Sequence, residues 1–190
     1  MIEVEIKIPV SDCNEIENKL KYLNFQKGEL VEEVDTYFTS DVYDFKENDM
    51  ALRIRRTKNI DTKKCRSYIT YKGVMLDEVS MTREELETEL EDGIIGEKIL
   101  KAIGFREVIP VKKLRQYYLL GNLTVCIDHV ENLGNFLEAE IIVSAERERE
   151  EALCHIRKLL EKLGYSMKET IRISYLSMLE ERMLLERDNA

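Results

Sequence analysis

The sequence has little of the cysteine and histidine from which proteins build zinc sites or disulfide frameworks. Its four cysteines lie far apart in the chain: Cys13, Cys65, Cys126 and Cys154. None has a second cysteine at the short spacing of a metal site, and only His129 and His155 could complete one. We therefore expect free thiols in a reducing cytosol, and we place both histidines outside any functional site.

The sequence also lacks a long apolar run, a basic amino-terminal segment and an excess of positive charge. No run reaches membrane-spanning length, and the first residues are acidic where a signal peptide would be basic and then apolar. The 29 Lys and Arg against 38 Asp and Glu give a net charge of -9, whereas nucleic-acid binders usually display a basic patch. We expect a cytoplasmic protein with no membrane and no nucleic-acid partner, in which any basic site is local.

The opening stretch, Met1 to Pro9, instead shows strict alternation of apolar and charged residues. The strand that it predicts has an apolar face formed by Ile2, Val4, Ile6 and Ile8. Its other face is charged and carries Glu3, Glu5 and Lys7. One such strand can simply turn its charges to water. The pattern of ionisable residues at i and i+2 returns, however, in Arg53/Arg55, Arg83/Glu85/Glu87, Lys113/Arg115 and Glu138/Glu140.

Seven further segments have strand character, and short links between them predict hairpins in a mainly antiparallel sheet. They are Asp35–Thr39, Ala51–Thr57, Ser67–Gly73, Met81–Leu90, Val111–Leu119, Leu123–Val130 and Phe136–Val143. Helical periodicity marks three segments, at about Asp12–Leu23, Ile94–Ile103 and Ala145–Leu163. It also marks a C-terminal helix at about 171–187, which either packs loosely or closes part of the fold. Because no linker separates these elements, we expect a single domain, 1–190.

The ends of the predicted helices carry their own signals. Ser11 is a suitable N-cap for the first helix. The first three helices end on similar sequences, in which Asn24, Gly104 or Gly164 is followed by an aromatic residue. Asn or Gly suits the left-handed position that ends a helix, and the aromatic can fold back onto the last turn. Either shared capping chemistry or an internal repeat would explain this similarity.

The charged strand faces are best placed inside a barrel. If they faced outward, the apolar faces would fill the interior, and the helices would have no apolar surface to cover. We therefore predict a barrel whose apolar outside is covered by helices and whose lumen is charged. An eight-stranded barrel can hold one small ligand, and a charged lumen is costly unless its charges are paired or bind one. Basic side chains suit polyphosphate oxygens, and carboxylates suit hard divalent metals.

These residues also resemble the signature of the CYTH superfamily, the triphosphate tunnel metalloenzymes. Glu3-Val4-Glu5-Ile6-Lys7 is similar to its ExExK motif, and ordered matches continue to Ser174-Tyr175. Between them lie Asp35-Thr36-Tyr37-Phe38, Ala51-Leu52-Arg53-Ile54-Arg55, Thr70-Tyr71-Lys72-Gly73, Arg83-Glu84-Glu85-Leu86-Glu87, Lys113-Leu114-Arg115, Asp128 and Gly134-Asn135-Phe136-Leu137-Glu138-Ala139-Glu140. The residues of these motifs are most similar to those of the class IV adenylate cyclase-like branch. Glu33 departs from it, because many relatives have a polar amide there.

The resemblance implies an α+β fold, an eight-stranded mainly antiparallel β-barrel tunnel with helices outside, and a bound Mg or Mn ion. The metal ligands it implies are Glu3, Glu5, Asp128, Glu138 and Glu140. The triphosphate would be gripped by Lys7, Arg53, Arg55, Lys72, Arg83, Lys113 and Arg115. Catalytic roles are implied for Lys7, Lys72 and Asp128. Glu85 and Glu87 would be supporting residues that bind or that orient the arginines.

The reaction itself stays open at this point. The class IV resemblance favours conversion of ATP to cyclic AMP and pyrophosphate, and the alternative is an inorganic, thiamine or nucleoside triphosphatase. A non-catalytic binder of nucleotide or polyphosphate would share the basic residues. The resemblance also suggests a homodimer. Asp35, with Tyr37 and Phe38, is either a ligand contact or a turn-flanking acid beside packing aromatics.

Overall fold

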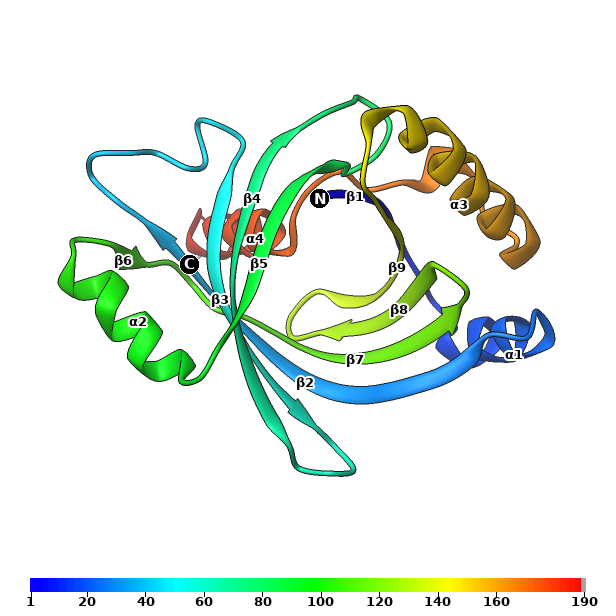
Figure 1. The fold of residues 1–190 in the computed structure, drawn as a ribbon, viewed down its shortest axis with the longest axis horizontal. Helices are drawn as coiled ribbons and strands as arrows, with labels where there is room; N and C mark the ends of the chain where they lie inside the picture. Colours follow the sequence, from blue (N-terminus) through cyan, green and yellow to red (C-terminus); the bar gives the residue numbers. More distant parts are fainter. Residues whose placement is uncertain (189–190) are drawn as a thin grey trace.

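Eight antiparallel strands close into a barrel in the computed structural model, which describes residues 1–188, so that positions 189–190 of the expected domain lie outside it (Figure 1). The strands are β1 (Ile2–Pro9), β2 (Gln26–Thr39), β3 (Ala51–Asn59), β4 (Cys65–Met75), β5 (Arg83–Leu90), β7 (Val111–Leu120), β8 (Leu123–Val130) and β9 (Gly134–Val143). Their order around the ring is β3-β4-β5-β1-β9-β8-β7-β2, and β2 pairs with β3 to close it. The predicted eight-stranded antiparallel barrel is confirmed.

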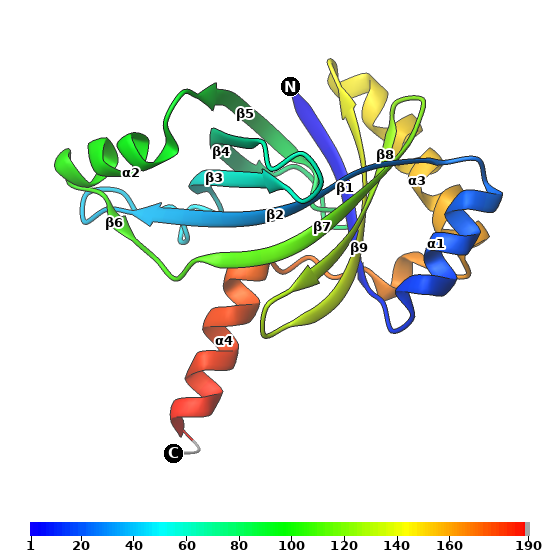
Figure 2. The same cartoon turned by 90° about the horizontal axis from the view of Figure 1, so that it is seen from below.

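The helices lie outside the barrel wall, as the alternation argument required. They are α1 (Cys13–Tyr22), α2 (Gly93–Ala102), α3 (Arg149–Leu163) and α4 (Tyr175–Asp188). Figures 1 and 2 show α1 and α3 side by side against β1 and β9, and α2 against β3 and β4. Within residues 1–188, no helix combines the length and the apolar character needed to cross a membrane.

The outward strand residues form the apolar core under these helices. Ile6 is fully buried in a cluster with Ile16 of α1 and Ile156 of α3. Ile54, also fully buried, packs beside Leu100 of α2. Burying a side chain of this size stabilises the fold by about 1.5–3 kcal/mol. The same alternation that fixes this core turns every second residue of each strand into the lumen.

Three helix ends have the predicted left-handed geometry. The backbone φ angles are 64° at Asn24, 102° at Gly104 and 90° at Gly164. In each case the next residue, an aromatic, donates its backbone N–H to a carbonyl in the last helical turn, as Phe25 does to Leu20 at 3.0 Å. These bonds satisfy carbonyls that a helix end leaves free. The start of α1 differs from expectation, because Asp12 and not Ser11 is the N-cap.

One expected strand, β2, is much longer than the predicted Asp35–Thr39. It begins at Gln26, and its register shifts between Lys27 and Leu30. Asp35 is therefore in the middle of a strand and is no turn-flanking acid. The structure also adds a two-residue strand, β6 (Arg106–Glu107), on the edge of β2, and short 3-10 turns at Glu146–Glu148 and Met167–Glu169.

The helix expected at 171–187 begins only at Tyr175 and closes one end of the barrel. Figure 1 shows α4 across the far opening of the ring, and Figure 2 shows it projecting from that end. Its Tyr175 and Leu179 pack with Val111, Val130 and Phe136, which are apolar residues at the ends of β7, β8 and β9. The segment before α4 is tied to β1, since Ile171 N–H donates to the Lys7 carbonyl at 2.8 Å.

Candidate functional site

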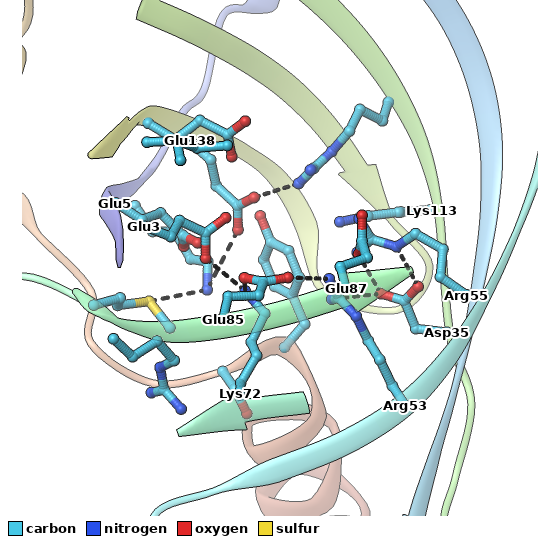
Figure 3. A pocket seen from close by; sticks show the side chains of 18 of the residues that line it. Glu3, Glu5, Asp35, Arg53, Arg55, Lys72, Glu85, Glu87, Lys113 and Glu138 are labelled. Carbon is cyan, nitrogen blue, oxygen red and sulfur yellow. Dashed lines mark hydrogen bonds and ion pairs between the residues drawn. The ribbon is translucent and has the colours of Figure 1, made fainter. Parts of the chain in front are cut away.

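The lumen holds a cavity of about 250 Å³ that contains nearly all the residues predicted for the site. Its predicted lining residues are Glu3, Glu5, Lys7, Arg53, Arg55, Lys72, Arg83, Glu85, Glu87, Lys113, Arg115, Glu138 and Glu140. Drug-sized ligands occupy roughly 300–1,000 Å³, so the enclosed space suits a phosphate chain more than a whole nucleotide. Figure 3 shows Glu3, Glu5, Glu85 and Glu138 gathered with Lys72 on one side, and Asp35, Arg53, Arg55 and Lys113 on the other.

Two acids of the cavity lie opposite each other on neighbouring strands, and neither forms a salt bridge within residues 1–188. The strand register places Glu5 of β1 opposite Glu140 of β9. Burial raises the pKa of the Glu5 carboxyl to about 7, and the nearby Glu138 and Glu3 add to the rise. Burial, followed by the charge of Glu3, raises the pKa of Glu140 to about 8. Burial and the neighbouring acids therefore outweigh the attraction of the cations around this pair, which are Lys7 and Lys72 for Glu5 and Arg115 for Glu140.

Lys72 bridges the next two acids. Its Nζ lies 2.7 Å from Glu3 Oε2 and 2.7 Å from Glu85 Oε2. Burial alone would raise the pKa of Glu3, but Lys72 and Glu85 outweigh it and hold that pKa at about 2. Burial would likewise lower the pKa of Lys72, yet the attraction of Glu3 keeps it above its ordinary value. Lys72 therefore stays a cation, and it is poorly suited to act as a general base.

Lys7 is held at the closed end of the cavity. Its Nζ lies 3.5 Å from Glu138 Oε1, 3.3 Å from Met81 Sδ and 4.2 Å from the centre of the Tyr175 ring. Burial would raise the pKa of Glu138, but Arg115 and then Lys7 hold it well below its usual range. The ring and the thioether leave the ammonium only partly neutralised, so it can still attract an anion.

Two arginines of the opposite wall each form a bidentate ion pair with an aspartate. Arg55 donates from Nε to Asp35 Oδ1 at 2.6 Å and from Nη2 to Oδ2 at 2.7 Å. Arg115 makes the same two-pronged contact with Asp128, at 2.6 and 2.5 Å. Such bidentate pairs are geometrically specific. Arg53 is freer, because its Nε has no hydrogen-bond partner within residues 1–188.

Asp128 is the predicted site residue that lies behind the cavity wall. It is fully buried, and besides Arg115 it contacts Lys113 at 3.4 Å and accepts a hydrogen bond from the Tyr175 hydroxyl at 3.0 Å. The structure thus places it where it can hold the bases in position. Its predicted metal and catalytic roles remain predictions.

The remaining predicted residues sit at the edges. Arg83 donates to the Gly73 carbonyl at 3.2 Å, and Glu87 accepts from the Thr70 hydroxyl at 2.7 Å. Glu85 lies 3.7 Å from Arg53 as well as beside Lys72, which fits an orienting role. Both histidines are exposed, as expected.

Three residues to which the sequence assigned no role in the site also belong to it. Glu33 is buried between the bases of the wall, Tyr117 lines the cavity, and Tyr175 caps it. Alternation could have found Glu33, because it precedes Asp35 by two positions and so shares its face. It was missed because the strand was expected to begin at Asp35. Tyr175 could not be placed without knowing that α4 turns back onto the barrel.

The carboxylates suit a divalent metal that arrives together with phosphate. Within residues 1–188, no three His, Cys, Asp or Glu side chains converge into a ready cage for an ion. Mg²⁺ usually needs no such cage, since it binds through one or two carboxylates and completes its shell with water and substrate phosphates. The facing pair Glu5 and Glu140 offers hard oxygen ligands, and in the described part no salt bridge occupies them. The donor set therefore fits the metal.

Comparison with known proteins agrees with this geometry. The family model of the CYTH domain matches residues 1–175. A protein of Methanocaldococcus jannaschii, named as a candidate adenylate cyclase, is 39% identical over 178 residues, which cover 94% of this chain and 98% of that protein.

Solved structures give the same answer. A protein from Pyrococcus horikoshii is 35% identical, with a TM-score of 0.86, and the match covers 95% of this chain and 99% of that one. A candidate adenylyl cyclase from Hippeastrum, reported with a dominant triphosphatase activity, is 19% identical with a TM-score of 0.57 over 86% of this chain and 87% of that one, and shows the fold alone. The chain belongs to the CYTH family, the triphosphate tunnel enzymes that its sequence resembles.

Proposed function

We propose that the protein is a metal-dependent enzyme of the class IV adenylate cyclase kind, which converts ATP to cyclic AMP and pyrophosphate. One observation carries the proposal: the barrel lumen brings seven basic side chains into the same cavity as Glu5 and Glu140, which form no salt bridge within residues 1–188. A buried collection of this kind is unfavourable unless a ligand completes it. A divalent metal would supply the positive charge that Glu5 and Glu140 lack, and the basic side chains would bind the polyphosphate that accompanies it.

The metal would be held by Glu5 and Glu140, with Glu3 and Glu138 beside them. When bound, Mg or Mn would neutralise charge that develops on the phosphate oxygens. Glu3 and Glu138 are already ionised, because Lys72 and Arg115 hold their pKa values low. Glu5 and Glu140 have raised pKa values and would release protons on ligation, so metal affinity should rise with pH.

The basic residues would bind the triphosphate in line with the acids. Lys72 Nζ lies beside Glu3 and Lys7 Nζ beside Glu138, and the Nε–H of Arg53 has no partner within residues 1–188. Arg55, Arg115 and Lys113 would supply charge from the far wall, with Asp35 and Asp128 fixing their positions. Phosphoryl chemistry asks a protein mainly for positioning and charge neutralisation, and this wall offers both.

The products depend on which phosphorus is attacked. Cyclisation requires the ribose 3′-oxygen to attack the α-phosphorus with loss of pyrophosphate, whereas a triphosphatase places water in line with the terminal phosphorus. The same lumen accommodates either, with the chain shifted or reversed. The Methanocaldococcus relative supports cyclisation, and the activity reported for the Hippeastrum protein supports hydrolysis as the second candidate.

The carboxylate assignment is tested by turnover of ATP with Mg or Mn in three variants. Glu5→Gln and Glu138→Gln should each abolish metal-dependent turnover, because they remove charge from the metal ligands. Glu84→Gln is the matched control, since Glu84 is exposed on β5 and is the neighbour of Glu85 in sequence. Unchanged turnover in the first two variants refutes the metal site. Tight binding of ATP with no turnover by the wild type supports a non-catalytic binder instead.

A further inference from the structure

Glu33 is a buried acid that the proposed roles leave unexplained. Only 1% of the residue is exposed, and its side chain lies in the wall between β3 and β7. Its Oε1 accepts a hydrogen bond from the Tyr117 hydroxyl at 3.1 Å. Its Oε2 makes no hydrogen bond within residues 1–188. A buried carboxylate oxygen without a directed partner is costly, so its surroundings must compensate in another way.

The compensation comes from three cations that share this oxygen. Oε2 of Glu33 lies 3.3 Å from Lys113 Nζ and 3.4 Å from Arg55 Nη1. It lies 3.9 Å from Arg115 Nε. All three cations line the cavity, whereas Glu33 stands behind them with a fully buried side chain. The Glu33 carboxylate therefore contacts these cations from behind the cavity wall. A phosphate oxygen in the cavity would contact the same cations from the other side.

Charge counting shows what Glu33 does to this wall. In the described part of the chain, one connected network of ion pairs joins six cations with six acids. The cations are Lys7, Arg53, Arg55, Lys72, Lys113 and Arg115, and the acids are Glu3, Glu33, Asp35, Glu85, Asp128 and Glu138. The charges of this network balance only because Glu33 is included. Without its charge the three cations around it would carry an excess positive charge in a buried setting, where electrostatic interactions are strong.

We propose that Glu33 is a specificity-determining residue that limits the negative charge the tunnel accepts, and so disfavours free inorganic tripolyphosphate relative to ATP. This inference rests on the proposed triphosphate function. Tripolyphosphate ionises at both terminal phosphates and binds through charge alone. ATP carries less charge, and the contacts of its nucleoside do not depend on the charge of the phosphate chain. The residue thus acts through Arg55, Lys113 and Arg115, as a positioning residue.

The test is the ratio of two affinities, measured by calorimetry in EDTA so that neither ligand is turned over. In the Glu33→Gln variant, tripolyphosphate should bind more tightly by about tenfold or more, the lower end of measured couplings between close charge pairs. The affinity for ATP should rise less, so that the ratio shifts toward tripolyphosphate. Glu32→Gln is the matched control, because Glu32 is the exposed neighbour on the outer face of β2 and should leave the ratio unchanged.

Stability gives a second readout that a purely structural role would not produce. Glu33→Gln should lower the melting temperature of the ligand-free protein, and tripolyphosphate should raise it by more than in the wild type, because phosphate replaces the missing charge. If the variant is insoluble without ligand, Glu33→Asp decides, since its shorter side chain withdraws the charge from the cations. It should shift the affinity ratio in the same direction by a smaller factor.

The outcomes separate the inference from the function on which it rests. A wild type that binds neither ATP nor tripolyphosphate in EDTA is titrated again with Mg, and absence of binding there too contradicts the proposed function, and the inference with it. A wild type that binds both, with the same affinity ratio in Glu33→Gln and Glu33→Asp, overturns the role of Glu33 alone. Weaker tripolyphosphate binding by a folded Glu33→Gln protein overturns it as well.

Discussion

Replacing Glu5 by Gln should make the metal-free protein more stable at neutral and alkaline pH. Glu5 is buried opposite Glu140, and burial with the charges of Glu138 and Glu3 raises its pKa from 4.5 to about 7. The folded state therefore holds the Glu5 proton more tightly than the unfolded chain does. The stability that this proton contributes is fully present below pH 4.5 and is lost as the pH rises through 7.

The size of the effect follows from the shift in pKa. Each pKa unit corresponds to about 1.4 kcal/mol, so a rise from 4.5 to about 7 removes about 3 kcal/mol of stability between these two pH values. Gln has no proton to lose and keeps a similar shape. The two proteins should have similar stability at pH 4.5, and Glu5→Gln should be more stable by about 3 kcal/mol at pH 8.

The assay is urea unfolding in EDTA at several pH values from 4.5 to 8, with Glu84→Gln as the control. Glu84→Gln should follow the wild type, since the side chain is exposed on the same barrel. Adding Mg or Mn at pH 8 should stabilise the wild type and have much less effect on Glu5→Gln. Parallel stability curves for wild type and Glu5→Gln across this range would refute the picture of a carboxylate pair that lacks positive charge.

Four further substitutions test other parts of the structure. Asp128→Asn leaves the buried Arg115 without its fork partner and should lower the free energy of unfolding by about 3–5 kcal/mol, and a loss under 1 kcal/mol contradicts the pairing. Tyr175→Phe removes the hydroxyl that donates to Asp128 and should cost about 1 kcal/mol in the same urea assay. Gly164→Ala introduces a side chain at a φ of 90° and should cost about 1–2 kcal/mol, whereas unchanged stability would disprove the strain. Lys72→Met should weaken tripolyphosphate binding at least thirtyfold, or about 2 kcal/mol, measured by calorimetry, and unaltered affinity removes Lys72 from the site.

Alternation carried most of the information about the fold. Because side chains of a strand point to opposite faces in turn, the positions of Lys7, Arg55, Lys72 and Arg115 in one lumen followed from spacing, and the structure confirms them. The outward position of Ile6 and Ile54 followed in the same way. These are local rules, which a sequence states directly.

Pairing between distant segments could not be worked out in this way. The part of β2 that was not predicted, residues 26–34, contains Gly28, Glu29, Glu32 and Glu33, and it is a strand because β7 pairs along it. Because this part was not predicted as a strand, the position of Glu33 in the lumen was not predicted either. The forks between Arg55 and Asp35 and between Arg115 and Asp128 also depend on neighbouring strands and their register. The sequence thus indicated which residues share the lumen, whereas the choice of ion-pair partners required the structure.

The proposed conversion of ATP to cyclic AMP can be tested by identifying the products formed from ATP that carries its label on the α-phosphate. The protein is incubated with this ATP and Mg, and in parallel with Mn, and the products are separated by chromatography. The expected products are labelled cyclic AMP and an equal amount of pyrophosphate, with no product when EDTA is present. Release of orthophosphate with the label remaining in ADP, and no cyclic product under either metal, would contradict the proposed conversion.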